Sequence, residues 1–141
     1  LPEVIERHGI TLVHGSPRAP MMEYVYSELV AQDAINDTDT AGVAVGHTHL
    51  AAIYEQREGL TRGILIDRSR PYSFAGVSFL VNPGSVGQPR DNDPRASYAV
   101  LDLDEETITH RRVDYDFELT AQRIRDAKLP EFLADRLASG R

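Results

Sequence analysis

Three of the five histidines in this 141-residue chain occupy positions from which they can bind a metal ion. His14 directly follows the apolar run Ile10 to Val13, and His47 follows the run Val43 to Val45 after a single glycine. His49 completes an H-x-H pair with His47. Imidazole nitrogen is a good ligand for zinc, iron, nickel and similar divalent ions. The pattern therefore predicts a metal site.

The two apolar runs have the composition of strands that would position these histidines. Both are short and rich in β-branched residues, so each is predicted to be a buried strand that ends at its histidine. Because sites in open α/β sheets collect beyond the carboxyl ends of strands, we expect the rings of His14, His47 and His49 to converge there. Gly15 and Gly46 are expected to let the backbone bend sharply beside the site.

The sequence does not decide how the rings of His47 and His49 are directed relative to each other. An extended backbone would project His47 and His49 to the same side. In a tight turn, the two rings would instead splay around one centre or bridge two. Residues 46–49 contain a glycine and are compatible with both arrangements.

The rest of the chain is predicted to form one α/β domain. Met22, Val25, Tyr26 and Leu29 recur at i, i+3, i+4 and i+7, which predicts one face of a helix that fades near Asn36. Further strands are predicted over 50–55, 63–66, 77–81, 98–101 and 107–113, the last two as a hairpin, with a loop over 67–76 and helices over 117–124 and 129–137.

Composition limits the classes of function. The net charge of −7 argues against a general nucleic-acid binder, which needs a basic surface. The absence of cysteine excludes disulfides and thiolate metal sites and fits a cytoplasmic location. No apolar run is long enough to cross a membrane. The composition is also compatible with a homo-oligomer.

Three segments resemble motifs of the calcineurin-like metallophosphoesterases. Residues 13–18 (V-H-G-S-P-R) resemble the fourth motif of that family, and residues 46–49 (G-H-T-H) resemble the fifth. Residues 82–90 (N-P-G-S-V-G-Q-P-R) are similar to the small prokaryotic branch, which includes phosphodiesterases and diadenosine-tetraphosphatase-like enzymes. The three segments follow one another in the order that the family has.

The resemblance implies an α/β fold, part of a four-layer αββα sandwich whose site holds two divalent metal ions (manganese, iron, zinc or nickel). By motif position, His14 and His47 would bind the second metal and His49 the first. The D-x-H, G-D-x-x-D and G-N-H-D/E motifs that supply the other ligands are absent. We therefore expect them upstream of Leu1, with residues 1–141 as the C-terminal portion of a single domain that is inactive alone.

The implied activity is metal-dependent hydrolysis of a phosphodiester, another small phosphate ester or a nucleotide. Two cations clamp the phosphoryl group and generate a hydroxide nucleophile, so no catalytic residue beyond the metal ligands is expected in this chain. One alternative is a catalytically inactive protein-interaction scaffold with the same fold. Another is a mononuclear zinc hydrolase built from the three histidines alone.

Several other polar residues are candidates for contacts in or near the substrate site. Asn82 and Ser85 are candidates for the wall of the substrate site, and Arg90 is a candidate for binding an anionic substrate, with Arg95 a second steering cation. Tyr24 is a weaker candidate for substrate contact. His8 and His110 are expected to be structural or solvent-facing, His110 on a half-exposed strand. Residues 91–93 (D-N-D) lack the glycine and the terminal glutamate of a calcium loop.

Overall fold

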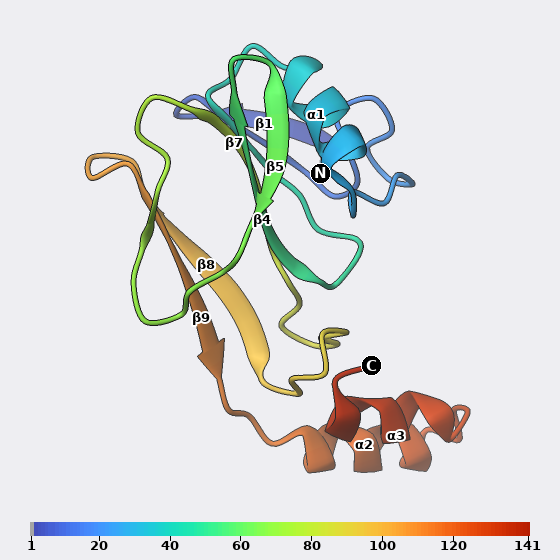
Figure 1. Ribbon diagram of the computed structural model, residues 1–141. Coiled ribbons are helices and arrows are strands. Elements are labelled where there is room, and N and C mark those ends of the chain that lie inside the picture. The colour runs from blue at the N-terminus through green and yellow to red at the C-terminus, as the bar shows by residue number, and fades with distance from the viewer. Residues whose placement is uncertain (1) are drawn as a thin grey trace.

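A computed structural model describes residues 2–141, which form two β-sheets and three helices (Figure 1). The elements in chain order are β1 (Val4–Arg7), β2 (Ile10–Val13), α1 (Glu28–Asn36), β3 (Gly42–Ala44), β4 (Ala51–Arg57), β5 (Leu60–Ile64), β6 (Tyr72–Ser73), β7 (Ser78–Pro83), β8 (Ala96–Asp102), β9 (Thr107–Val113), α2 (Phe117–Asp126) and α3 (Phe132–Ser139).

The larger sheet, sheet A, contains the parallel strands that position the histidines. Its strand order is β1-β2-β3-β7-β4-β5, and the smaller sheet B has the order β6-β9-β8. Within sheet A, β3 pairs in parallel with β2 on one side and with β7 on the other. Leu12 lies opposite Ala44, and Ala44 lies opposite Val81. The carboxyl ends of these three strands therefore meet at one edge.

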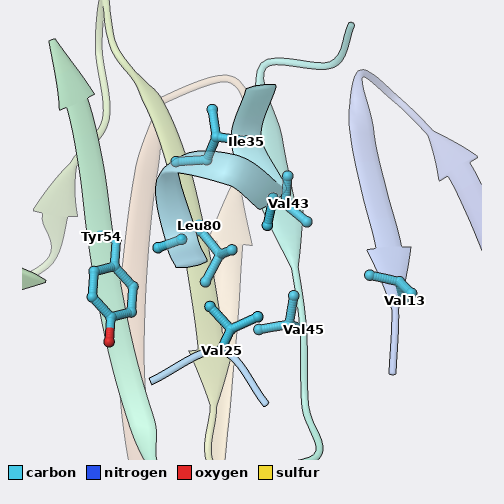
Figure 2. Packing of buried hydrophobic residues seen from close by; sticks show 9 residues of the cluster. Val13, Val25, Ile35, Val43, Val45, Tyr54 and Leu80 are labelled. Atoms are coloured by element: carbon cyan, nitrogen blue, oxygen red, sulfur yellow. The ribbon is translucent and has the colours of Figure 1, made fainter. Parts of the chain in front are cut away.

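Helix α1 covers one face of sheet A (Figure 2). Successive residues of a strand point to opposite faces, so Val43 and Leu80 contact the helix side while their neighbours face away. Ile35 packs down from α1, and Tyr54 closes the cluster from β4. The remaining buried members are Val13, Val25, Ala31, Ala34 and Val45.

Sheet B covers the opposite face of sheet A. Phe79 and Val81 from β7 pack with Ile108 from β9 and with Phe74, which follows β6. The Phe79 ring lies over Gly42, where an added Cβ would stand only 2.3 Å from the ring carbon Cζ. Gly42 is therefore needed for the ring to reach this position.

Helices α2 and α3 pack on each other through Ala121, Ala134 and Leu137. Figure 1 shows this hairpin beyond the ends of β8 and β9 rather than over the face of sheet B. The expected α/β class is confirmed, and residues 2–141 supply α1, sheet A and sheet B as three successive layers. None of the helices in this range is long and apolar enough to cross a membrane.

One strand was not predicted, and one local expectation was wrong. A strand at 4–7 was not foreseen, and the segment 22–27 is a loop because Ser27 caps a helix that begins only at Glu28. The loop is held by Arg18, whose guanidinium donates to Glu23. Arg18 also forms an ion pair with Asp33 on α1. Of the four residues of the apparent stripe at 22–29, only Leu29 lies in a helix.

Glu55 links the two sheets. This carboxylate on β4 is 3% exposed, accepts a hydrogen bond of 2.5 Å from the Tyr72 hydroxyl on β6, and contacts Arg57 and Arg62. The Tyr72 hydrogen bond and the neighbouring arginines lower the pKa of Glu55, against the effect of burial. A depressed carboxyl pKa stabilises the fold above the unfolded-state pKa, and this contribution is lost as pH falls through the folded-state pKa.

We predict that Tyr72→Phe lowers the free energy of unfolding at pH 7 by about 1.5–3 kcal/mol, the usual contribution of a hydrogen bond to a charged group. Urea denaturation at pH 7 and again below pH 4 provides the measurement. The loss of stability on acidification should be smaller in Tyr72→Phe than in the wild type. Equal free energies of unfolding for the two proteins at pH 7 would show that the hydrogen bond between Tyr72 and Glu55 does not stabilise the fold.

Candidate metal centre

His14 and His47 lie together at the edge where β2 and β3 end. The two nitrogens His14 Nε2 and His47 Nδ1 are 2.9 Å apart, and the rings meet edge to face with their centroids separated by 4.6 Å. The strands also remain joined beyond their regular pairing, because Gly46 N donates to His14 O at 2.9 Å. The parallel register therefore brings together two histidines that are 33 positions apart in the sequence.

The turn that carries His47 and His49 has an unusual backbone. Both histidines have left-handed φ angles, 60° and 62°, a conformation that costs a non-glycine residue about 1–2 kcal/mol. Such strain is typical of functional sites, where the surrounding structure holds it in place. The chain bends at Gly15, as expected, and directly after Gly46, at His47 and Thr48, although neither glycine has a positive φ. At Gly15, an added Cβ would instead collide with the Ala19 carbonyl oxygen, at 2.7 Å.

Asn82 holds this turn. Its side chain is 1% exposed, and its amide group donates to Gly46 O at 2.6 Å and to Thr48 Oγ1 at 2.9 Å. The Asn82 carbonyl oxygen accepts from Gly84 N at 2.9 Å. Since burial and these three bonds occupy the side chain, we assign Asn82 to support of the histidine turn rather than to the wall of the substrate site.

His49 points to a different partner. Its Nδ1 lies 2.8 Å from the carbonyl oxygen of Gln88, and because a carbonyl only accepts, Nδ1 carries the proton. Burial lowers the pKa of His49, and the charges of Arg90 and Arg136 lower it further. The neutral ring therefore keeps a lone pair on Nε2. A metal-binding histidine usually donates from one ring nitrogen to a carbonyl or carboxylate and binds the metal through the lone pair of the other.

The spacing of the His14 and His47 nitrogens is compatible with two ligands of one metal ion. Two nitrogens bound to one tetrahedral zinc ion lie about 3.3 Å apart, close to the separation of His14 Nε2 and His47 Nδ1. Nowhere in the described part of the chain do three histidine, aspartate or glutamate side chains gather around one ion position. The three rings therefore do not gather around one ion position, as a mononuclear three-histidine zinc site would require.

Tyr24 also belongs to this site, although sequence reasoning placed it on a helix. Its ring stacks on His47 with a centroid separation of 3.9 Å and an interplanar angle of 19°. It comes from the loop before α1, which folds back toward the edge of sheet A. Stacking restricts the rotation of the His47 ring and keeps Nδ1 directed at His14.

The loop that follows β7 supports His49 from the other side. Ser85 Oγ accepts from Gln88 N at 2.9 Å and closes the turn that presents the Gln88 carbonyl. Arg90 N donates to His49 O at 3.2 Å. Arg95, in contrast, is engaged by Asp93 through two side-chain bonds of 2.9 and 2.7 Å. The Arg90 guanidinium donates through Nη2 to Gln88 Oε1 at 2.9 Å.

The other two histidines lie outside the site. His8 is exposed in the turn between β1 and β2, with φ of 52°. His110 is only 5% exposed, so the expected half-exposed position was wrong. Its Nε2 lies 2.7 Å from Ser97 Oγ, and Ser97 Oγ donates to the Pro83 carbonyl. Burial lowers the pKa of His110, which keeps this packed ring neutral.

Comparison with known proteins identifies the family. Residues 3–106 match the calcineurin-like phosphoesterase superfamily domain. The chain is 34% identical over 146 residues to the uncharacterized protein MJ0912 of Methanocaldococcus jannaschii, covering all of this chain and 57% of that protein. It thus spans less than three-fifths of the length of this curated relative.

Two solved structures are similar to this chain. The metallophosphoesterase from Sphaerobacter thermophilus is 37% identical, with a TM-score of 0.90 over 100% of this chain and 59% of that one. The hypothetical protein PH1004 from Pyrococcus horikoshii OT3 shares the fold, with a TM-score of 0.75 at 20% identity over 100% of this chain and 52% of that one. The chain belongs to the calcineurin-like phosphoesterase superfamily. The resemblance of residues 13–18, 46–49 and 82–90 to that family is confirmed.

We predict that Asn82→Ala destabilises the fold by about 1–3 kcal/mol, because it leaves Gly84 N without its partner and removes the two bonds from the Asn82 amide to the histidine turn. Asn36→Ala is the matched control. Asn36 is exposed, and its substitution should change stability by less than about 0.5 kcal/mol. Chemical denaturation of both variants provides the comparison. Similar small effects at both positions would contradict the role assigned to Asn82.

Proposed function

We propose that this chain is part of a metal-dependent phosphoesterase whose dinuclear centre hydrolyses a phosphodiester or a nucleotide phosphate ester. The observation that supports the proposal most directly is the pair His14 Nε2 and His47 Nδ1, which face each other across 2.9 Å at the joined ends of β2 and β3. In a metal-free state one of these nitrogens holds a proton, which a divalent ion would displace.

His14 and His47 would hold one ion, and His49 would bind the other through Nε2. Manganese, iron, zinc and nickel all accept imidazole ligands, and the histidines alone do not choose among them. When bound, two such ions polarise the phosphoryl group and generate a hydroxide nucleophile at neutral pH. The contribution of this chain is to orient the imidazoles: Tyr24 stacks on His47, and Gln88 O fixes His49.

Charge balance requires carboxylates beside these histidines. Two divalent ions carry four positive charges, which neutral imidazoles do not offset. We propose that residues beyond this chain bring those carboxylates, since the relatives extend beyond the part aligned with it. Residues 1–141 alone would accordingly be inactive.

An open apolar groove between the sheets supports this proposal. It has a volume of 430 Å³ and is bordered by β2, β3 and β7 of sheet A and by β8 of sheet B. Among residues 2–141, β8 pairs only with β9, so its other edge is available to a further strand. A neighbouring hollow shares Leu12, Ala44 and Pro83 with the groove and continues to His14. A strand added here would end beside the histidines.

We predict that His47→Asn removes bound metal from the full-length protein and lowers turnover of bis(p-nitrophenyl) phosphate with manganese. The loss should exceed the roughly 10–100-fold that follows removal of an outer-shell partner. Asparagine tolerates a left-handed φ, so the turn is retained. Metal content by mass spectrometry of the purified protein and initial rates are the two measurements.

His8→Asn is the matched control, because His8 also has a left-handed φ but lies in the exposed β1–β2 turn. This variant should retain metal and turnover. If the wild-type full-length protein binds no metal and hydrolyses no phosphodiester, the proposal fails, and a protein-interaction scaffold with this fold becomes the better account.

A further inference from the structure

Two exposed tyrosine rings adjoin the candidate metal centre. The Tyr24 ring stacks on His47 with a centroid separation of 3.9 Å. The Tyr26 ring is the next neighbour of Tyr24, with a centroid separation of 6.4 Å and an interplanar angle of 42°. Tyr24 is 45% exposed and Tyr26 is 68% exposed. The three rings therefore form a chain of neighbours that begins at a proposed metal ligand and ends at an exposed aromatic side chain.

The backbone that carries the two tyrosines is fixed on both sides and in the middle. Val25, between them, is buried and points into the cluster under α1, where it lies near Val45 (Figure 2). Before the tyrosines, the Arg18 guanidinium donates to Glu23 at 3.0 and 2.7 Å. After them, Ser27 caps α1. The rings are thus presented by an ordered segment that is already anchored to the core.

The same segment leaves an unusual amount of apolar surface exposed. Its exposed large side chains are Met21, Met22, Tyr24, Tyr26 and Leu29. Exposed apolar groups that collect in one region typically mark a binding surface. A protein partner would suit the methionines and the leucine equally well. The stacking of Tyr24 on His47, however, ties the aromatic part of this surface to the metal centre, and this favours the substrate as its occupant.

We propose that Tyr26 forms a stacking subsite for the base of a nucleotide substrate. The proposal rests on the function proposed above, since the phosphate of that nucleotide would lie on the metals. A nucleotide separates its phosphate from its base by a ribose, and Tyr24 likewise separates Tyr26 from His47. Every base has a flat π face, so stacking on an aromatic side chain requires no particular hydrogen-bond pattern. The subsite would favour nucleotides over non-aromatic phosphate esters without selecting one base.

The test uses two phosphonates, in which a methylene group replaces the bridging ester oxygen so that neither is hydrolysed. One is the analogue of adenosine monophosphate and the other is the analogue of ribose 5-phosphate, which lacks the base. Calorimetric titration of the manganese-loaded full-length protein gives the ratio of their affinities. The wild type should prefer the adenosine phosphonate, and Tyr26→Ala should lower this preference by about 5–100-fold, as expected for loss of one base–aromatic stack.

Two further substitutions separate stacking from apolar contact. Tyr26→Phe keeps the flat ring and should keep the preference, whereas Tyr26→Leu keeps an apolar side chain without a flat ring and should lose it. Tyr98→Ala is the matched control, because Tyr98 is an exposed tyrosine on β8 whose neighbour Ala99 faces sheet A, so that Tyr98 points away from it. This control should leave the preference unchanged.

Equal affinities of the wild type for the two phosphonates, or an unchanged preference in Tyr26→Ala, would overturn the proposal. If Tyr26→Ala lowers the free energy of unfolding but not the preference, the ring packs against protein rather than against a base. Failure of the wild type to turn over bis(p-nitrophenyl) phosphate would instead reject the proposed function. The calorimetric comparison still decides the stacking subsite in that case, because it measures binding without hydrolysis.

Discussion

The parallel pairing of β2, β3 and β7 is the constraint on which the rest of the site depends. Parallel strands bring their carboxyl ends to one edge, and here each end is followed by a polar residue directed at that edge. β2 leads to His14, β3 leads through a two-residue extension to His47, and β7 carries Asn82 near its end. A change of register in any of these strands would separate the two facing imidazoles.

The strain in the histidine turn is held by buried polar contacts rather than by apolar packing. His47 and His49 both have left-handed backbones, and the Asn82 side chain bonds the residues on either side of His47. Buried polar groups stabilise a structure only when every donor and acceptor is satisfied. Asn82 meets that condition, so the turn is already ordered before any ligand binds. Preorganised ligands lose less conformational entropy when a metal arrives.

Local pattern predicted the parts of the site that depend on strand ends. His14 and His47 each follow a short β-branched run that was predicted to be a strand. Because sites in open α/β sheets lie beyond the carboxyl ends of the strands, the two histidines were expected to lie together. The stripe at 22–29 misled because loop residues happened to fall at helical spacing, with Met22 76% exposed and Val25 2% exposed. Only the tertiary contacts of Arg18 and the cap at Ser27 distinguish this segment from a helix.

The remaining site residues could not be predicted because their positions depend on long-range contacts. Tyr24 reaches His47 through the fold of a loop, and Arg90 N reaches His49 O through the loop that follows β7. His110 alternates with arginines in the sequence, yet it is 5% exposed, and its Nε2 lies 2.7 Å from Ser97 Oγ on the paired strand β8. A local sequence pattern does not report contacts between residues that are far apart in the sequence.

The most direct test of the metal centre is a crystal structure of the full-length protein after saturation with zinc, with anomalous scattering recorded at the zinc edge. The account predicts one ion about 2 Å from both His14 Nε2 and His47 Nδ1, and a second ion at His49 Nε2. A structure in which His14 and His47 remain hydrogen-bonded to each other, with zinc absent or bound elsewhere, would contradict it.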